Sequence, residues 1–467
     1  MIKKSLVSLA CLVGCTSLFA QQATVSTDLP GQPYFLKKTW MIGGVGNWDF
    51  ITVDPSYPKL YVAHGRVVQV VDIETGTVEG EIGGLWDARA IALDDRGEFG
   101  FISDAGTNKV LIFNRQTLSV LAKIQVPLNP RSLVFDPSTG LVFVVCGQPP
   151  GSLPADRRRS PEASGAEWER NAVEGINQAG SYTVRKPAPA PSRFPAPSRA
   201  KEPPPESVIA ILDPEKHIVV ANLLLRGRAG FAQTDGGGRI FINIVNQNSL
   251  LRLDAVKLKA LWQSEPAPTP APKPIVASSD KLPAASVVAR MDSSTSQSSA
   301  VSLDWRNFSP ESPFPEDVAH FYALNRSCSE PQGLTIDARH LRLFVACSNR
   351  QIQALNIDTG EVIAKLPTSS GTGVIEYDPN QALIFAASGD EGGTLTIIQQ
   401  TVTDNYRVVQ NLRTCFRARV MAVNRSSGEV YLVTDAGQED MSDGKGLQAP
   451  PPKGPGPSSF HVLVVGH

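Results

Sequence analysis

The run Phe50-Ile-Thr-Val-Asp-Pro55 opens a segment in which apolar and polar side chains alternate through four short stretches. It is followed by KLYVA at 59–63, VVQVVD at 67–72 and TGTVEGEI at 75–82. Asp, Pro and Gly residues separate these stretches, as they do where tight turns join short strands. Because successive side chains of a strand point to opposite faces, the segment predicts a four-stranded antiparallel sheet.

This unit recurs along the chain with a period of roughly 40 residues, which is typical of the blades of a β-propeller. Every copy begins with an apolar strand that ends in Asp or Asn. We therefore predict an all-β fold, a seven-bladed β-propeller of four-stranded antiparallel blades. The later copies begin at Ala90–Asp94, Ser132–Asp136, Phe231, Gly333–Asp337, Val374–Asp378 and Val420–Asn424, and the fourth is expected to end at Trp262.

The seventh copy is one strand short. It offers Val420–Asn424, Val430–Val433 and His461–Val465, whereas Phe35–Ile42, ahead of the first copy, has the pattern of an unpaired outer strand. Closing the ring with strands from both termini would remove an exposed sheet edge. We expect Phe35–Ile42 to pair with the C-terminal blade beside His461–Val465.

Three stretches rich in Pro, Ala and Ser interrupt the copies, at about 147–206, 264–327 and 437–459. Their composition predicts flexible or extended segments, because it buries too little apolar area to offset the entropy of ordering. Within the second stretch, 316–325 has a helical pattern. The strands of a blade are here labelled a to d outward from the channel.

The positions of the three stretches predict that they share one face of the ring. The first and third would join strand b to strand c, and the second would join strand d to the next strand a. In an antiparallel meander these connections all lie on one face. A face remodelled to recruit a partner is one explanation, and chance placement of tolerated insertions is the other.

The N-terminus has the layout of an export signal. Met1–Lys4 is positively charged, Leu6–Val13 is apolar, and Ala20 is a small residue at a cleavage position. We expect a signal peptide over 1–20, a flexible 21–33, one propeller domain over 34–467, and a periplasmic or secreted protein. The segment at 12–15 (LVGC) also resembles a lipobox, so a lipoprotein anchored through Cys15 is the alternative.

Several repeat residues resemble the YVTN-type β-propeller family, which includes YncE-like extracytoplasmic proteins. Leu60–Ala63 and Val430–Val433 match the second strand of that repeat, and Asp358–Val362 matches its turn into the fourth strand. The resemblance covers nearly the whole chain outside the signal and the interruptions. It implies a propeller fold, but propellers host many functions, and it transfers no catalytic residue.

One repeat position carries three arginines. It lies five residues before the Asp or Asn that ends strand a, so its seven residues should ring the channel mouth. Guanidinium groups there suit a carboxylate or phosphate through forked hydrogen bonds, which predicts an anionic ligand or partner. The seven residues are Asp49, Arg89, Arg131, Gly230, Gln332, Gly373 and Arg419.

The alternative is that these arginines are paired internally. Hairpin register would place Asp104 opposite Arg89 and the pair 434–435 opposite Arg419. Arg131 would face Cys146, which is no carboxylate, and is therefore the strongest binding candidate. Gln332 and Asp49 complete the tentative ligand-binding set.

Of the cysteines beyond the signal segment, Cys328 and Cys347 flank one hairpin and are a plausible disulfide in an oxidising compartment. Buried thiols are the alternative for Cys146, Cys328, Cys347 and Cys415. The six histidines show no close metal-ligand spacing, and there is no nucleotide-binding, nucleophile-elbow or zinc-protease motif. We expect no metal, no cofactor and no catalytic residue.

These features favour an extracytoplasmic binding or scaffold protein, monomeric, that holds a protein or a small anionic ligand at the channel mouth. A lactonase-like or quinoprotein-like enzyme is one alternative, with Asp49, His64 and Asp104 as the acids and histidine near the mouth. A DNA-binding YncE-like protein is another. With 44 basic and 45 acidic side chains, nucleic acid is not favoured, although 157–159 is an Arg run. No segment after the signal is apolar enough to span a membrane.

Overall fold

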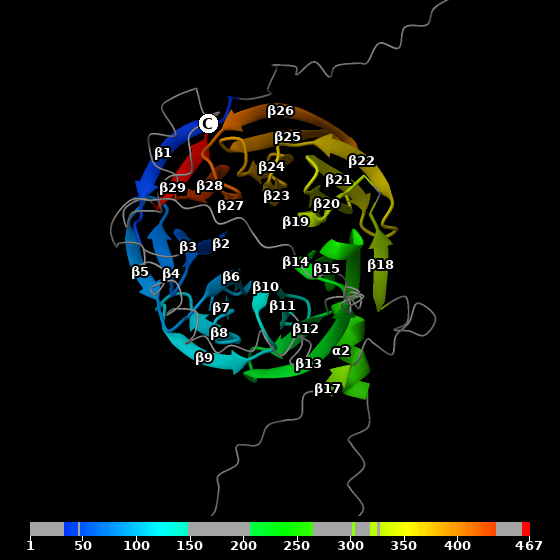
Figure 1. Ribbon diagram of the computed structural model, residues 1–467. Helices are drawn as coiled ribbons and strands as arrows, with labels where there is room; N and C mark the ends of the chain where they lie inside the picture. The colour runs from blue at the N-terminus through cyan, green and yellow to red at the C-terminus, as the bar shows by residue number, and fades with distance from the viewer. Residues whose placement is uncertain are drawn as a thin grey trace, which may run out of the picture.

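Seven β-sheets are arranged in a ring around a central axis (Figure 1). The computed structural model describes residues 32–44, 47–147, 206–264, 301–303, 318–324, 327–435 and 460–467. The signal segment and most of the three interruptions lie outside these residues. The predicted cleavage position, Cys15 and most of the segments predicted to be flexible therefore fall outside the described part of the chain. The predicted seven-bladed propeller is confirmed.

Five blades follow the meander that the repeat predicted, with strand a innermost. Blade 1 contains β2 (Trp48–Val53), β3 (Lys59–His64), β4 (Val67–Asp72) and β5 (Val78–Ile82), and blade 2 contains β6 (Ala88–Leu93), β7 (Phe99–Asp104), β8 (Lys109–Asn114) and β9 (Val120–Gln125). Blade 3 contains β10 (Pro130–Asp136), β11 (Leu141–Cys146), β12 (Glu206–Asp213) and β13 (Ile218–Arg226). Blade 5 contains β19 (Pro331–Asp337), β20 (Arg342–Cys347), β21 (Gln351–Asn356) and β22 (Val362–Pro367), and blade 6 contains β23 (Thr372–Asp378), β24 (Leu383–Ser388), β25 (Thr394–Val402) and β26 (Asn405–Arg413).

Blade 7 is built from both ends of the chain. It contains β27 (Val420–Asn424), β28 (Glu429–Thr434) and β29 (His461–Gly466), and β1 (Phe35–Met41) adds the outer strand. β1 runs antiparallel to β29 from Phe35 opposite Gly466 to Met41 opposite His461, as predicted. Trp40 also stacks on Tyr431, with ring centroids 5.5 Å apart. The closure of the ring by the N-terminal strand is therefore confirmed.

Blade 4 corrects the sequence analysis at its outer strand. It contains β14 (Ala229–Thr234), β15 (Arg239–Ile244), the 3-10 turn η3 (Val245–Gln247) and β16 (Ser249–Asp254), but its fourth strand is β18 (Ala319–Ala323). The segment expected to end the blade is the helix α2 (Ala255–Ser264). Conversely, 319–323 was expected to be helical and is a strand.

Local chemistry and tertiary packing explain this exchange. The carboxylate of Asp254 accepts a hydrogen bond from the Lys257 backbone N–H at 2.9 Å, which caps the first turn of α2, and the Ala-, Leu- and Lys-rich sequence favours a helix. In β18, Tyr322 is buried against blade 5, whereas Phe321 is 46% exposed. A further strand, β17 (Val301–Leu303), pairs in parallel with β13 and makes the sheet of blade 3 five-stranded.

The second interruption therefore leaves a different face from the other two. It joins strand c to strand d of blade 4, a connection that lies with the a–b turns. Consistent with this position, the Ala255 N–H donates to the Gly238 carbonyl, and Lys259 Nζ donates to the Thr139 carbonyl 2.9 Å away. The expectation that all three interruptions share one face is wrong for the second, because β18 and not α2 ends the blade.

The core lies between neighbouring blades. Strands b and c are buried on both faces, so β3, β11 and β24 are nearly continuous runs of buried side chains, whereas the outer strands alternate. One cluster joins blade 7 to blade 1 through Ile51, Val62, Val433 and Val462. Burial between sheets thus holds the ring together around its whole circumference.

Arg115 is the largest fully buried side chain and ties blade 1 to blade 2. Its Nε donates to the Asp54 carboxylate at 3.0 Å, and its Nη1 donates to the carboxylate and the carbonyl of Asp94 at 3.0 and 2.8 Å. Tyr61 adds a hydroxyl donor to Asp54 at 3.2 Å. Two aspartates that end strands a are therefore neutralised by one guanidinium.

Replacing Arg115 with alanine should lower the free energy of unfolding by about 3–5 kcal/mol, because Asp54 and Asp94 would stay buried without a counter-charge. Urea unfolding followed by tryptophan fluorescence measures the loss. The control is Arg96→Ala, which removes an exposed ion pair with Glu215 and should change stability by less than about 0.5 kcal/mol. Equal stability of the two variants would contradict a structural role for the buried pair.

Candidate functional site

The candidate site is the face of the ring on which strands a begin, here called the rim face. The b–c and d–a connections lie on this face, so the first and third interruptions leave from it. The seven predicted rim residues do occupy equivalent positions there. In blades 1 to 6 the pairing of strand a with strand b is irregular at this point, with β-bulges such as Ala88/Ile91 and Pro130/Ser132.

These bulges change the partners that hairpin register predicted. Asp104 pairs with Ala88, one residue before Arg89, and Cys146 pairs with Pro130, one residue before Arg131. A bulge adds an unpaired residue to one strand and turns its side chain toward a new neighbour. The expected pairing of Arg89 with Asp104 is therefore wrong.

Arg89 is paired instead with two other carboxylates. Its Nη1 lies 3.1 Å from Asp49, and its Nη2 lies 2.8 Å from Asp87. Although burial opposes the charge, the hydrogen bond to Asp49 and the two carboxylates raise the pKa of Arg89. For Asp49, burial raises the pKa of the carboxyl group, and the hydrogen bond and charge of Arg89 lower it only in part. Asp49 and Arg89 thus neutralise one another.

Asp104 has a structural role beside this pair. Its carboxylate accepts hydrogen bonds from the backbone N–H groups of Trp86 and Asp87 and from the Thr107 hydroxyl, the last at 2.6 Å. It therefore fixes the d–a connection that carries Trp86.

Arg131 is exposed, and among the described residues no hydrogen bond or ion pair engages its guanidinium. Its charge acts on Asp49, whose pKa it lowers through space. Since Asp49 is already hydrogen-bonded to Arg89, Arg131 keeps its donors available to a carboxylate or phosphate from outside.

Arg419 is also exposed and lies beside Gly373 of the neighbouring blade. Its Cβ and Cγ pass within 3.3 and 3.4 Å of the position that a Cβ would take on Gly373, so a side chain there would displace it. The expected partner Asp435 pairs with Arg417 instead, at 2.6 Å. The pairing predicted for Arg419 is therefore wrong, and the neighbouring arginine takes it.

The other rim positions contribute little binding chemistry. Gln332 Nε2 donates to the backbone carbonyl of Glu330 at 3.2 Å, and the backbone carbonyl of Gln332 accepts a hydrogen bond from Asn243 Nδ2. Gly230 and Gly373 have no side chain. At this repeat position the cationic side chains are therefore those of blades 2, 3 and 7.

Aromatic side chains accompany these arginines, and sequence reasoning did not identify them. Trp86 is 51% exposed with the Arg66 guanidinium 4.0 Å from its ring centroid, and Phe416 is 43% exposed. Arg417 lies 4.5 Å from the ring centroid of Trp48. An aromatic residue in a short rim connection, as in Gly83-Gly-Leu-Trp86, is the signal that could have found them.

Ring contacts, ion pairs and chain neighbours connect most of these residues into one surface, which Arg131 joins through its electrostatic effect on Asp49. Arg66 stacks on Trp86, which adjoins Asp87 and Arg89; Asp49 adjoins Trp48; and Arg417 on Trp48 adjoins Phe416 and Arg419. Arginine and tryptophan are the residues most enriched at the energetic centres of protein interfaces. We call this surface the arginine–tryptophan patch: Trp48, Arg66, Trp86, Arg89, Arg131, Phe416, Arg417 and Arg419.

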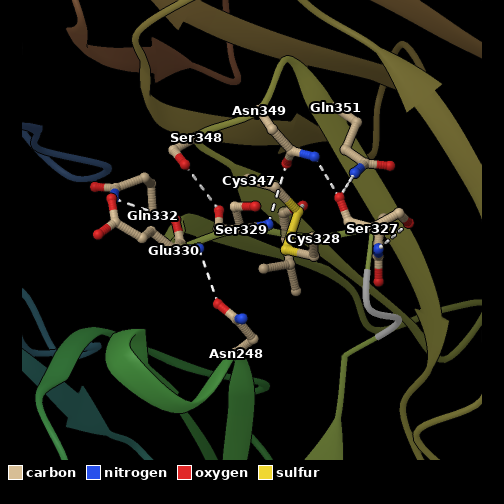
Figure 2. The surroundings of a disulfide bond; sticks show 12 residues. Asn248, Ser327, Cys328, Ser329, Glu330, Gln332, Cys347, Ser348, Asn349 and Gln351 are labelled. Atoms are coloured by element: carbon tan, nitrogen blue, oxygen red, sulfur yellow. Dashed lines mark hydrogen bonds between the residues drawn. A yellow bond between two sulfur atoms is a disulfide. The ribbon is translucent and has the colours of Figure 1, made fainter.

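A disulfide also lies at the rim face, between the connection into blade 5 and the end of β20 (Figure 2). Cys328 and Cys347, the pair expected from the hairpin, have Cα atoms 5.2 Å apart and are both buried. Around them, Ser329 N–H donates to Asn349, and Glu330 N–H donates to Asn248 of blade 4 at 3.0 Å. Cys146 and Cys415 are buried outside any disulfide, and burial raises the pKa of the Cys146 thiol.

Neither a metal-binding cluster nor a membrane-spanning helix occurs in the described part of the chain. It contains no group of three or more His, Cys, Asp or Glu side chains placed to hold a metal ion. Nor does any helix among these residues have the length and apolarity to cross a membrane.

Comparison with known proteins identifies the fold. No protein-family model and no curated protein matches the chain. Solved structures do: U3-55K (7% identity, TM-score 0.52, 92% of this chain and 98% of that chain), the RRP9 WD40 repeats (7%, 0.53, 92% and 97%) and a chain of the mitotic checkpoint complex (10%, 0.52, 90% and 96%). At such identities the likeness shows a shared propeller architecture.

Reduction of the disulfide should destabilise the protein. Closing the loop between Cys328 and Cys347, which are 19 residues apart, removes entropy from the unfolded chain worth about 3 kcal/mol. Urea unfolding should show that dithiothreitol lowers the free energy of unfolding of the wild type by roughly this amount. The double variant Cys328→Ser/Cys347→Ser is the control and should not respond to the reductant; an equal response of both proteins would show that another effect is responsible.

Proposed function

We propose that this chain is an extracytoplasmic propeller scaffold that binds an acidic segment of a protein partner on the arginine–tryptophan patch. The observation that carries the proposal is Arg131, an exposed guanidinium without a described partner. Asp49, the carboxylate on which the charge of Arg131 acts, is paired with Arg89.

The composition of the patch favours a peptide over a small inorganic anion. Exposed Trp86 and Phe416 offer apolar area that a protein segment would cover, which a phosphate ion would not. A planar guanidinium can bind a carboxylate with two parallel hydrogen bonds, and partial desolvation by the neighbouring rings would strengthen them. A segment that mixes Asp or Glu with aromatic residues fits both features. The propeller fold supports such a binding or scaffold role.

The enzymatic alternative receives less support from the same face. Asp49 is paired with Arg89, and Asp104 accepts backbone N–H groups. His64 is 2% exposed, and its Nδ1 contacts Gln69 at 2.9 Å. The groups that a lactonase-like site would need are thus engaged in structural hydrogen bonds.

DNA is also a weaker candidate for this face. Asp49 and Asp87 lie among its arginines, and the whole chain has a formal charge of −1. A phosphate backbone is held by an unbroken array of cations, which this patch does not provide. The Arg run at 157–159 lies outside the described residues.

Export is supported by two independent features. The sequence of residues 1–20 has the layout of a signal peptide, and a buried disulfide is typical of proteins that fold in an oxidising compartment. Membership of the YVTN, YncE-like group is part of the same proposal and depends on the repeat residues quoted above.

Expression of the full-length chain in a Gram-negative host tests the export proposal. Mass spectrometry of the periplasmic or secreted protein should show a mature N-terminus at Gln21. A diacylglycerol adduct on Cys15 would instead establish the lipoprotein alternative. Retention of an uncleaved chain in the cytoplasm would contradict export.

Fluorescence polarisation with a fluorescein-labelled hexapeptide of alternating glutamate and tyrosine tests the binding face. Arg131→Ala should weaken binding by about 1.5–3 kcal/mol, roughly 10- to 150-fold in Kd, because a charge-assisted pair is lost. Arg96→Ala, on the opposite face, is the matched control and should bind like the wild type. Thermal melting verifies that both variants fold.

Two results would refute this role of the patch. One is an unchanged Kd in Arg131→Ala. The other is equal affinity of the wild type for a lysine–tyrosine peptide of the same length. Loss of stability in Arg131→Ala, without a specific loss of binding, would assign the arginine to the structure.

A further inference from the structure

The central channel contains a second candidate site, distinct from the rim face. A cavity of about 270 Å³ lies within it, walled by the innermost strands of the blades. On its rim side, Phe50 of blade 1 and Phe231 of blade 4 meet across the channel, with ring centroids 4.8 Å apart. From there the lining continues toward the opposite face through Thr52, Gln233 and Glu376.

Glu376 is the one charged residue in its layer of the channel. The equivalent position, two residues before the end-of-strand Asp or Asn, is described in all seven blades. The other six residues are Thr52, Ala92, Val134, Gln233, Thr335 and Ala422. No feature of the repeat therefore requires a carboxylate there.

The structural task of this position needs only a neutral polar group. Thr52 Oγ1 donates to the Ile91 carbonyl, and Thr335 Oγ1 accepts the Tyr377 N–H, each linking one blade to the next. Glu376 does the same through Oε2, which accepts the Val423 N–H at 3.3 Å. A glutamine at this position could accept the same hydrogen bond, so the fold does not require a negative charge there.

The charge is also poorly compensated. Burial raises the pKa of Glu376 to about 7; Arg425 and the Val423 N–H oppose this effect only in part, and Asp378 adds to it. Across the described residues, the amide of Gln233 in the same cavity makes no hydrogen bond. The cavity thus offers one anion, one amide, and aromatic and aliphatic walls that include Leu334 and Met421.

We propose that the channel cavity binds a small organic ammonium ion, with its nitrogen on Glu376 and its apolar body against Phe50 and Phe231. A cation there would offset the part of the Glu376 charge that Arg425 leaves uncompensated, and the two rings would cover the apolar body of the ligand. A lone carboxylate is too few ligands for calcium or zinc, and the other polar groups of the lining are neutral hydroxyl and amide side chains such as those of Ser132, Thr234 and Gln233. The site is independent of the rim face and takes a ligand of opposite charge.

The probe is 4-fluorobenzylamine, which is cationic at pH 8 and small enough for the cavity, followed by ¹⁹F NMR titration of the whole mature chain. We expect saturable binding that weakens about tenfold between pH 8 and pH 6. Protonation of Glu376 as the pH falls through its pKa removes the negative partner, which gives this sign. The neutral analogue 4-fluorobenzyl alcohol should bind at least tenfold more weakly.

Glu376→Gln keeps the acceptor for the Val423 N–H and should lose at least tenfold in affinity at pH 8, together with the pH dependence. Glu361→Gln, at an exposed turn of blade 5, is the matched control and should bind as the wild type does. Absence of saturable binding to the wild type, or equal affinity in Glu376→Gln, would overturn the proposal. Arg131→Ala should leave this binding unchanged, so the outcome is separate from that of the rim face.

Discussion

The pairing of β1 with β29 is the constraint on which the rest of the structure depends. It completes blade 7 with a strand from the other end of the chain, so this blade has four strands and β29 is paired along both of its edges. Tyr34, just before β1, extends the closure to blade 6, where its backbone exchanges hydrogen bonds with the Gln410 amide at 3.0 and 2.7 Å. The channel and the rim exist only because the seven strands a are held at fixed separations by this closed ring.

The closed ring also explains why charged side chains lie at the rim, whereas apolar side chains fill the space between the blades. Strands b and c are buried between neighbouring sheets and are filled with apolar side chains. At the start of strand a the ladder is broken by a bulge in six blades, and the side chains there turn out of the packed layer. Charged residues such as Arg89 and Arg131 can lie at that point without the cost of burial between sheets.

Two regions of opposite character result along the ring axis. The rim face carries the arginine–tryptophan patch, and the channel beneath carries Glu376, with Phe50 and Phe231 between them. Among the described residues no ion pair joins a rim arginine to Glu376. Each region therefore keeps a charge that a ligand can satisfy, an anion on the rim and a cation in the channel.

The sequence by itself determined the number of blades and the closure, because alternation within a strand and the spacing of turns are local properties that a 40-residue period repeats. It placed the rim residues correctly, including Arg131, since that position is fixed by its distance from the Asp or Asn that ends strand a. It could not give their partners. A bulge shifts register by a residue, so Asp49, from another blade, and not Asp104 pairs with Arg89.

Only the tertiary structure decided which segment ends blade 4. Ala255–Ser264 and Ala319–Ala323 both carry apolar residues, and the choice depends on the Asp254 cap and on the packing of Tyr322 against blade 5. The carboxylate of Glu376 likewise looks ordinary in sequence. Its place in the cavity and its only partly offset charge arise from strands that meet around the channel, which no local pattern encodes.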